Sequence, residues 1–546
     1  MKKIILFLFT AVFGFPILSP TALVETELSY KIRNERGVHS FGTYHNGAAQ
    51  VNLVNGNLML KRPIFERPGA AGFNLDLSLY YNSKIWDRDA TQMYARWSSG
   101  SLGVGWRFGF PSLKTGTSTY SIYYPDGSSH ELQPYDDGTW RSIDSTYIVY
   151  DPSTNTATFS DGSKLKFQTM GCTHTDRNGN KITAYNDAYG RLSYARDTTG
   201  VAARFFYTTE GMLDYVLVYG KTYAKIEFYY EDAYLGPVYP PRFSLPVQTK
   251  TGRKFLKLIT TRLPDRFLEE RFSYFPGTGE LYKIEKGVFY GSMERFDTIA
   301  TFNYDTISFA DPTYTTAEER VVTSTYEYSG TTSYSTSFNY TMNGNSSNPS
   351  QTKVTDIRGV TFYNFFSSVY PARSWKDGLM SSLQRQNSSL TKTYRTQTSD
   401  WEQDIPGAVY MVNPRRIGQT ITLNDEISLT KEMVYSSDGT GNIKQLLEYK
   451  YDSTEVLRET TYDYLHETNP DYAARRLIRL PTAVSIKDGN GTEVSRTEYA
   501  YDEYPLKYYT TGGPGDYDYS YKYMTIRGHQ TSIKRKYIEE DRFVTT

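Results

Sequence analysis

The sequence predicts an all-β fold made of an antiparallel array of repeated hairpins. Three observations predict it: a repeat of 21 residues, many turn dipeptides, and an aromatic content of 16% with 51 tyrosines among 546 residues. A repeat of this length is typical of units that bury an apolar face only by stacking on their neighbours. A stacked array also accounts for a chain long enough to suggest several domains, because it grows without separate cores.

The repeat is defined by pairs of identical residues at one spacing. An offset of 21 residues relates Asp176 to Asp197, Gly179 to Gly200, Gly190 to Gly211, Leu192 to Leu213 and Tyr194 to Tyr215. Asp-x-x-Gly indicates a tight turn in which glycine takes a positive φ. Residues 181–185 alternate as a strand does, 186–190 form a second turn, and 191–194 begin the return strand. One period therefore corresponds to one hairpin.

Turn dipeptides recur along the whole chain. Asn-Gly begins at 46, 55, 178, 343 and 490, and Asp-Gly begins at 126, 137, 161, 377, 438 and 488. Such dipeptides between alternating segments are the strongest short-range signal for hairpins. Tyrosine suits a pleated surface because its ring is apolar and its tip is polar. We expect antiparallel sheet through residues 40–546, with helix confined mainly to the N-terminal segment.

The N-terminus has the pattern of a secretory signal. Lys2 and Lys3 form the basic region, and the apolar stretch 4–18 is too short and too interrupted for a membrane span. We expect cleavage near Ala22, although Pro-Thr-Ala is a poor cleavage sequence, and an uncleaved anchor is the alternative. No other stretch resembles a membrane span. The chain is expected to be exported, either secreted or at a bacterial cell surface.

Cysteine content excludes an internal disulfide, since Cys172 is the only cysteine. We interpret Cys172 as a half-buried strand residue, with His174 on the same face by strand alternation. A reactive nucleophile is the alternative.

Charge is balanced, with 60 Lys and Arg against 60 Asp and Glu, so no basic footprint for nucleic acid is present. We interpret Arg475-Arg476 and the basic run 534–536 as charged strand edges that oppose edge-to-edge pairing.

Nucleotide-binding and metal-binding motifs are each incomplete. A phosphate loop at 220–222 has Tyr215 where glycine is required, and the glycines at 103 and 105 are followed by Phe108 where a dinucleotide site needs glycine. Trp106 there is interpreted as a packing residue. A calcium-loop pattern, with Asp176, Asn178, Asn180 and Asp187 as candidate ligands, has Lys181 where an EF-hand needs glycine.

Catalytic motifs are also incomplete. Residues 136–140 partly resemble a sialidase Asp-box but lack its serine, so a hairpin turn is favoured. The six histidines form no zinc-binding pattern, and no Gly-x-Ser-x-Gly elbow is present. Paired carboxylates for glycoside hydrolysis stay open as a hypothesis, because sequence does not give their separation. We predict no catalytic, cofactor-binding or metal-binding residues, no cofactor, and a protein that is not an enzyme.

Several segments share one pattern of glycine, tyrosine and aspartate. The clearest is 185–192, Tyr-Asn-Asp-Ala-Tyr-Gly-Arg-Leu, and related segments lie at 51–58, 80–83, 102–108, 124–127, 480–484 and 527–531. These residues resemble the YD-repeat (RHS-repeat) family. The resemblance is closest at 46–215, looser at 475–535 and weakest at 230–430.

The resemblance implies a spiralling β-hairpin sheet that forms a hollow shell, with this chain as its N-terminal portion. It divides the chain into a signal peptide (1–22), an N-terminal β region (23–170), a repeat pair (171–230), a degenerate repeat region (231–430) and C-terminal repeats (431–546). Toxin-bearing members end their repeats with a self-cleavage segment and an effector. Neither pattern is found here before Thr546.

Two functions follow from these expectations. The first is an exported structural protein, part of a β shell that encloses or displays a partner and has no chemistry of its own. The alternative is a cell-surface carbohydrate-binding or adhesion module, in which exposed tyrosines stack on glycans. We also expect an exposed sheet edge near 521–524 and 532–534, which would pair with a copy of the chain or with a second chain that completes the shell.

Overall fold

The structure is a computed structural model. It describes residues 37, 42–46, 49–88, 91–95, 101–116, 119–219, 224–236, 243–246, 250–263, 266–289, 296–311, 315–330, 332–504, 517–537 and 542–545. The signal segment 1–22, Gly47 of the first Asn-Gly pair and the triplet 220–222 lie outside these residues.

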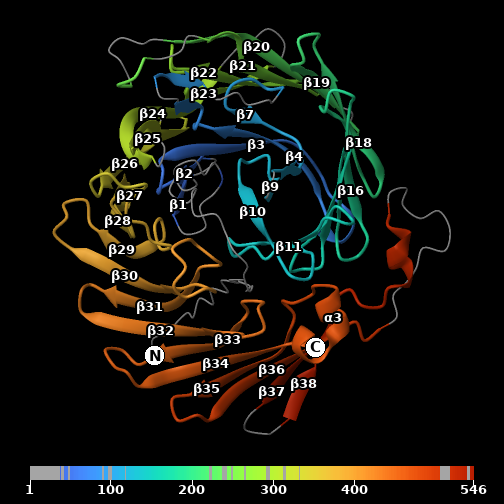
Figure 1. Cartoon of the computed structure of the whole chain (residues 1–546), viewed down its shortest axis with the longest axis vertical. Coiled ribbons are helices and arrows are strands. Elements are labelled where there is room, and N and C mark those ends of the chain that lie inside the picture. The colour runs from blue at the N-terminus through green and yellow to red at the C-terminus, as the bar shows by residue number, and fades with distance from the viewer. Residues whose placement is uncertain are drawn as a thin grey trace.

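A small antiparallel sheet forms first in the chain and lies inside the molecule (Figure 1). Its strand order is β1-β2-β3-β4-β7. The strands are β1 (Thr43–Asn46), β2 (Ala49–Asn52), β3 (Asn57–Arg67), β4 (Leu75–Asn82) and β7 (Trp106–Arg107). Between β4 and β7, β5 (Trp86–Arg88) and β6 (Met93–Ala95) form a separate two-stranded ribbon. We call the five-stranded sheet the inner sheet.

A second sheet contains every later strand, and each strand pairs antiparallel with the next one in the sequence. Its ribbon runs round the inner sheet and then continues across the lower part of the molecule (Figure 1). We call it the outer sheet. Its strands are β8 (Ser112–Thr115), β9 (Tyr120–Tyr123), β10 (Ser129–Pro134), β11 (Trp140–Ser142), β12 (Val149–Asp151), β13 (Thr156–Thr158), β14 (Lys164–Gln168), β15 (Gly171–Thr175), β16 (Lys181–Asn186), β17 (Leu192–Asp197), β18 (Gly200–Tyr207), β19 (Leu213–Val218), β20 (Ala224–Leu235), β21 (Lys250–Arg262), β22 (Phe267–Tyr274), β23 (Leu281–Phe289), β24 (Phe296–Asp311), β25 (Thr315–Ser329), β26 (Thr332–Met342), β27 (Pro349–Asp356), β28 (Gly359–Phe365), β29 (Met380–Gln386), β30 (Thr393–Glu402), β31 (Arg415–Leu423), β32 (Ile427–Tyr435), β33 (Ile443–Tyr449), β34 (Val456–Tyr464), β35 (Pro481–Asp488), β36 (Glu493–Tyr501), β37 (Gln530–Tyr537) and β38 (Arg542–Thr545).

Helices are short in the described residues. They are η1 (Ala70–Gly72), α2 (Leu465–Thr468), α3 (Pro470–Ala474) and η2 (Tyr519–Tyr523). Among the described residues, no helix combines the length and the apolar composition needed to cross a membrane. The predicted all-β antiparallel fold is therefore confirmed.

Two predictions about strand edges are wrong. The expected edge strand at 521–524 is instead η2, whose Tyr521 is buried against the turn at Gly179. Residues 532–534 do lie in a strand, but β37 pairs with β36 on one side and β38 on the other. Arg475-Arg476 also lie outside any strand, directly after α3. Tyr521, Arg475 and Arg476 were mistaken for residues of an exposed sheet edge because the sequence does not show which distant segments contact them.

The predicted turn chemistry is confirmed at the repeat. Gly190 and Gly211 have φ of 76° and 85°. Asp176 accepts hydrogen bonds from the backbone N–H of Asn178 and Asn180, and Asp197 accepts one from Thr199. Each aspartate therefore holds its own turn closed, which explains why Asp-x-x-Gly repeats.

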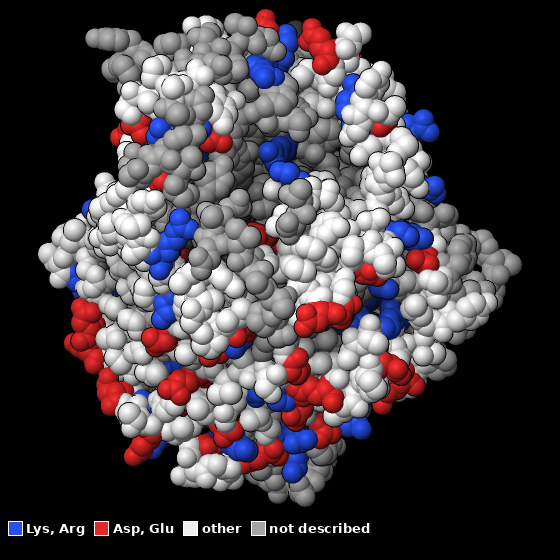
Figure 2. All heavy atoms as spheres, in the orientation of Figure 1, with Lys and Arg blue, Asp and Glu red and all other residues white. Residues whose placement is uncertain are grey.

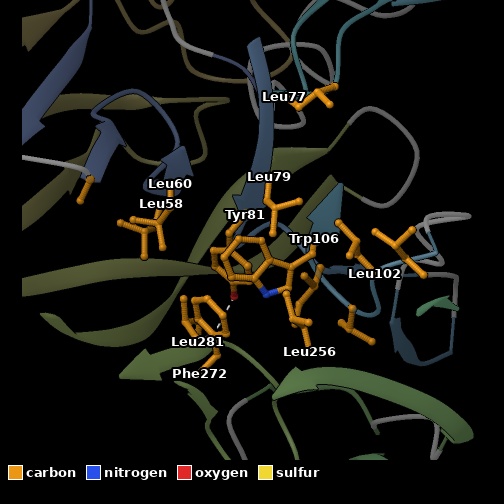
Figure 3. Close-up of a cluster of buried hydrophobic side chains, with 14 of the residues drawn as sticks. Leu58, Leu60, Leu77, Leu79, Tyr81, Leu102, Trp106, Leu256, Phe272 and Leu281 are labelled. Carbon is orange, nitrogen blue, oxygen red and sulfur yellow. Dashed lines mark hydrogen bonds between the residues drawn. The ribbon is translucent and has the colours of Figure 1, made fainter. Parts of the chain in front are cut away.

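The inner sheet supplies the core of the molecule (Figure 3). Leu58, Leu79 and Trp106 are fully buried and meet apolar side chains of the outer sheet. Polar contacts fix the register between the two sheets. The Tyr81 hydroxyl accepts a hydrogen bond from the backbone N–H of Leu281 at 2.8 Å. The expectation that Trp106 is a packing residue is confirmed.

Backbone contact also joins the sheets at Gly56. The backbone N–H of Val322 donates to the carbonyl of Gly56 at 3.0 Å. Gly56 has a φ of 68°, and a Cβ there would lie 2.4 Å from the Val321 side chain. Glycine is therefore required at this site both by its dihedral angle and by the close approach of β25.

Tyrosine hydroxyls connect successive strands of the outer sheet. Each donates to a backbone carbonyl on the preceding strand, at distances of 2.6–3.0 Å; the donor and acceptor pairs are Tyr207–Leu192, Tyr230–Leu213, Tyr274–Leu256, Tyr304–Leu281, Tyr340–Val322, Tyr435–Arg416, Tyr464–Ile443 and Tyr501–Pro481. The indole N–H of Trp401 does the same to Met380. We call these contacts the tyrosine rungs.

Most tyrosine rungs coincide with a β-bulge. The strand register shifts immediately before Tyr207, Tyr274, Tyr435, Tyr464 and Tyr501. A bulge interrupts the ladder of backbone hydrogen bonds. The tyrosine hydroxyl beside each bulge donates a hydrogen bond to a backbone carbonyl near the interrupted ladder. The repeated tyrosine and the repeated bulge therefore belong to one local structure.

Loops close the two ends of the outer sheet against each other. An isolated bridge pairs Asp161 with Leu477, and another pairs Asn180 with Tyr517. The backbone N–H of Asn413 donates to the carbonyl of Ile143 at 2.6 Å. We call this line of contacts the seam. It brings turns near residues 143–180 against segments after residue 410.

Replacing Gly190 or Gly211 by valine is predicted to destabilise the fold by on the order of 1 kcal/mol or more, because a β-branched residue tolerates positive φ poorly. Nothing lies within 4 Å of a Cβ built at Gly190, so its dihedral angle alone sets the effect. Chemical denaturation should show the loss, and Gly190→Asn, which tolerates positive φ, should recover most of it. Unchanged stability in both valine variants would contradict this account of the repeat.

Replacing Tyr340 by phenylalanine is predicted to cost about 1–3 kcal/mol, because it leaves the buried carbonyl of Val322 without its donor. Tyr334→Phe, on the same strand with its ring exposed, is the matched control and should have almost no effect. Equal stability of the two variants in urea denaturation would show that the rungs contribute nothing.

Candidate functional site

A cavity lies where β30 to β32 meet the seam. Its volume is about 1010 Å³, and its lining includes Arg141, Glu402, Asp404, Arg415, Glu432 and Asp438. Most of these residues come from the consecutive strands β30 to β32 and the turn after them, and Arg141 comes from across the seam. Figure 2 shows many acidic and basic side chains on the lower part of the molecule, which β31–β38 occupy in Figure 1.

Arg415 is the central cation of this cavity. Its guanidinium contacts Glu402 at 2.5 Å and also pairs with Asp404, and it lies over the Tyr435 ring at 5.3 Å. Burial alone would lower the pKa of Arg415, but the hydrogen bond to Glu402 and the charge of Asp404 reverse this effect and raise it. Arg415 is therefore charged at any physiological pH and neutralises two of the carboxylates around it.

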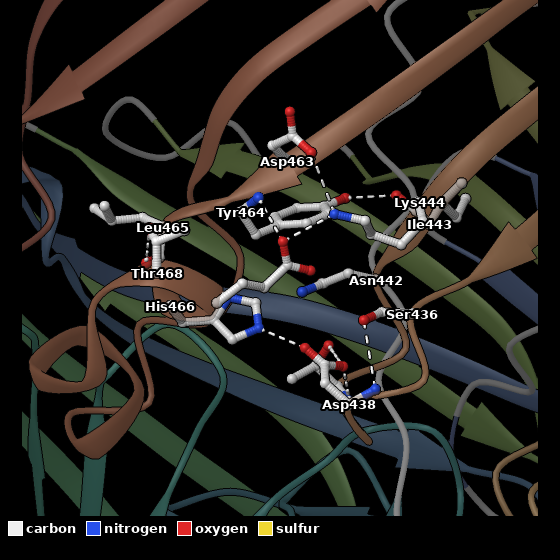
Figure 4. Close-up of polar contacts among 12 residues, drawn as sticks. Ser436, Asp438, Asn442, Ile443, Lys444, Asp463, Tyr464, Leu465, His466 and Thr468 are labelled. Carbon is white, nitrogen blue, oxygen red and sulfur yellow. Dashed lines mark hydrogen bonds and ion pairs between the residues drawn. The ribbon is translucent and has the colours of Figure 1, made fainter.

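A polar cluster adjoins the cavity (Figure 4). His466, on α2, contacts Asp438 through Nε2 at 2.8 Å. Glu467 accepts a hydrogen bond from the Lys444 ammonium at 2.8 Å and one from the backbone N–H of Tyr464. The cluster therefore ties the short helix α2 to β33 and to the turn after β32.

Asp438 is held in its charged form by this cluster. Burial would raise its pKa, but hydrogen bonds from His466 and from the side chain and backbone of Thr440 lower it well below its usual value. The contact thus stabilises the fold only while Asp438 is ionised.

One atom each from Asp438, His466 and Glu467 lies within 4.8 Å of the others, which is close enough to share a metal ion. Lys444, however, already supplies a cation to Glu467. Asp438, His466 and Glu467 each already contact a protein group, although His466 Nδ1 is buried without a hydrogen-bond partner among the described residues, and we interpret the cluster as a structural network. Sequence reasoning missed it because 28 residues separate Asp438 from His466 and no spacing motif joins them.

The four residues weighed as calcium ligands in the sequence are not all brought together, because Asp187 lies apart from the turn that holds Asp176, Asn178 and Asn180. Asp176 and Asp187 lie in turns at opposite ends of β16, and six strand residues span roughly 20 Å. Asp176 is occupied by N–H donors of Asn178 and Asn180, and Asp187 by Arg191. The side-chain amides that were candidate ligands therefore point their N–H groups at the carboxylate.

Cys172 lies in β15 and is buried, at 3% exposure, as a strand residue. Burial raises the pKa of its thiol to about 12, so the thiolate needed for nucleophilic chemistry is not formed at neutral pH. Asp137, in the stretch that resembles an Asp-box, closes a hairpin turn by accepting hydrogen bonds from the backbone and side chain of Thr139. Both residues have structural surroundings, but Cys172 is fully buried rather than half-buried as predicted.

The stability contributed by Asp438 is predicted to be lost as pH falls below about 4. Its folded pKa is depressed relative to an unfolded value of about 3.9, so the contribution is complete above that value and declines in acid. The difference in urea midpoint between the wild type and Asp438→Asn should therefore shrink from pH about 6 to about 3. In a His466→Gln background the same substitution should have a smaller effect. A constant difference across this range would contradict the assignment.

No protein-family model and no curated protein matches the chain. Solved structures that share some similarity include a porin-like protein from Bacteroides uniformis, 12% identical, covering 53% of this chain and 88% of that one with a TM-score of 0.20. They also include the Photorhabdus luminescens Tc holotoxin pore, at 10% identity and a TM-score of 0.24, and a TcdB2–TccC3 complex, at 11% and 0.23. This chain is covered to 90% in both, but spans only about a quarter of each toxin chain, 26% and 27%. Similarity at this level carries no argument about fold or function.

Proposed function

We propose that the chain is an exported YD-repeat protein whose outer sheet forms part of a β shell around a polypeptide partner, without chemistry of its own. The resemblance of its repeats to that family supports the first part of the proposal. The observation that carries the second is a row of apolar side chains on the face of the outer sheet that turns toward the inner sheet.

The row can be followed through the strand register. Tyr363 packs against the core and lies opposite Leu383, which also packs there. The register then leads from Leu383 to Gln397 and on to Ile421. The face that the inner sheet covers in β27–β29 is therefore the face that presents Ile421 in β31.

Beyond β31 the same face carries further apolar side chains, which alternate with a charged row in which Lys431 lies opposite Glu448 and Glu448 opposite Arg458. Ile421 lies opposite Leu429, and Met433, two pairs of residues further along that strand, lies opposite Leu446. Thr460 links Leu446 to Ile486. These apolar side chains are only half-buried. We call Ile421, Leu429, Met433, Leu446 and Ile486 the apolar row.

The opposite face of the same strands is mixed, since Val434 lies opposite Gln445 and Leu447 lies opposite Glu432. Thr420 pairs with Thr430, and Gln445 pairs with Thr461. Because the apolar row continues the face that the inner sheet covers in β27–β29, we infer that it contacts another apolar surface. A polypeptide segment fits this surface, because it can cross the strands along the row and place its apolar side chains against it.

Photo-cross-linking tests the proposal. An unfolded polypeptide passenger fused in frame after residue 546 is the probe, and a photoreactive residue replaces Ile421 or Leu446. Thr420 and Gln445, their neighbours on the opposite face, are the matched controls. We expect cross-links to the passenger from the apolar row and few from the controls.

Protease protection gives a second measurement. The passenger should resist digestion when fused to the wild type and should lose this resistance in Ile421→Asp with Leu446→Asp, while Thr420→Asp with Gln445→Asp retains it. Equal cross-linking from both faces, or digestion at equal rates in all three proteins, would contradict the proposal.

A further inference from the structure

A series of short turns runs along one end of the strands from β27 to β36. Successive antiparallel strands place their turns alternately at the two ends of the sheet, so every second turn lies at the same end. The turns at this end are 357–358, 387–392, 424–426, 450–455 and 489–492. The hairpin ends of β29–β36 lie along the left and lower edge of the view in Figure 1. We call these turns, with the strand ends beside them, the turn ridge.

Backbone contacts hold the central turns of the ridge side by side. The N–H of Asn424, in the turn between β31 and β32, donates to the carbonyl of Tyr394 at the start of β30 at 3.1 Å. The N–H of Asp452, in the turn between β33 and β34, donates to the carbonyl of Ser428 at 3.0 Å. Neighbouring turns therefore keep fixed positions relative to one another and present one continuous surface.

Large apolar side chains are exposed along the turn ridge. The most exposed are at its tips, with Ile357 at 78% and Tyr451 at 61%. Together with these two, the exposed apolar residues of the ridge include Leu390, Tyr394, Leu423 and Ile427. A connected series of large apolar side chains on a surface is typical of a contact site for another macromolecule.

Charge on the ridge is divided between two adjacent turns. Lys392 and Arg395 lie at the end of one turn, and Asp425 and Glu426 lie in the next. All four side chains are exposed, and none makes an ion pair with another of the described residues. One turn is therefore basic and its neighbour acidic, with apolar side chains beside both.

We propose that the turn ridge is the interface of a symmetric dimer of this chain. A two-fold axis brings the same surface of both copies together. An axis between the two charged turns places Lys392 and Arg395 of each copy against the acidic turn of the other, and buries the apolar side chains between them. The chain carries 60 basic and 60 acidic side chains, so two copies do not repel each other overall. This contact is made by turns rather than by an unpaired strand edge, and it does not depend on an enclosed polypeptide.

Sedimentation equilibrium of the full chain tests the dimer. We expect a monomer–dimer equilibrium whose dissociation constant rises with salt concentration. A cationic variant, Asp425→Lys with Glu426→Lys, should dimerise about a hundredfold or more weakly, because like charges then face each other. An anionic variant, Lys392→Glu with Arg395→Glu, should do the same. An equimolar mixture of the two variants should restore the dimer, because every contact in the mixed pair again joins opposite charges.

Glu210→Lys with Asp214→Lys is the matched control. Both acids are exposed near the start of β19, and this change adds the same charge as the cationic variant. The control should dimerise as the wild type does. All the substituted side chains are exposed, so urea midpoints should stay unchanged; if one variant fails to fold, the other still shows whether charges of the ridge hold the dimer. A wild type that stays monomeric up to about 100 μM, a dimer that neither variant weakens, or a mixture of folded variants that stays monomeric would overturn the proposal.

Discussion

The outer sheet depends on one recurring interaction, the hydrogen bond from a tyrosine hydroxyl to a carbonyl on the preceding strand. A ladder of hairpins needs a bulge or a turn at each reversal, and each one leaves backbone groups without their regular partners. The rung satisfies one such group and packs the tyrosine ring against the next hairpin. Tyr464 shows both roles, since it contacts Ile443 through its hydroxyl while it pairs with Pro481, whose carbonyl accepts the next rung from Tyr501. The interaction therefore propagates from hairpin to hairpin.

The inner sheet solves a different problem. A continuous sheet has two faces, and one of them must be covered by something apolar. Leu58 and Trp106 provide that cover, and the hydrogen bonds at Tyr81 and Gly56 fix where it lies. Charged groups are also buried at this contact. Lys84, between β4 and β5, lies 3.4 Å from Glu319 of β25, and both are almost fully buried. Such an ion pair fixes the position of the two sheets more than it stabilises their contact, because the cost of removing both charges from water offsets much of their attraction.

The elements that could be predicted from sequence are those fixed locally. The positive φ of Gly190 and Gly211, the capping by Asp176 and the burial of Trp106 each follow from a residue and its immediate neighbours. The apolar row was not predicted from the sequence. Its residues come from several strands, and the face of the sheet on which each lies depends on the register of all the strands between them. The acceptors of the rungs lie 15 to 23 residues away, so the tyrosine content suggested exposed rings, whereas the rung tyrosines are half-buried or buried donors. Arg475 and Arg476 were mistaken for an edge for the same reason: their partners lie about 300 residues earlier in the chain.

The order of the chain has a consequence in time. The inner sheet is synthesised first, yet its partners come much later; the Tyr44 hydroxyl, for example, donates to Asp356, which lies 312 residues further on. Until those strands emerge, the apolar faces of the inner sheet have nothing to cover them. The nascent chain therefore winds its hairpins onto a template that is exposed from the start, and the seam forms last. Folding of this kind is slow and leaves apolar surface open to aggregation for as long as synthesis continues. We therefore expect the apolar faces of such a chain to need protection from aggregation until its last hairpins have formed.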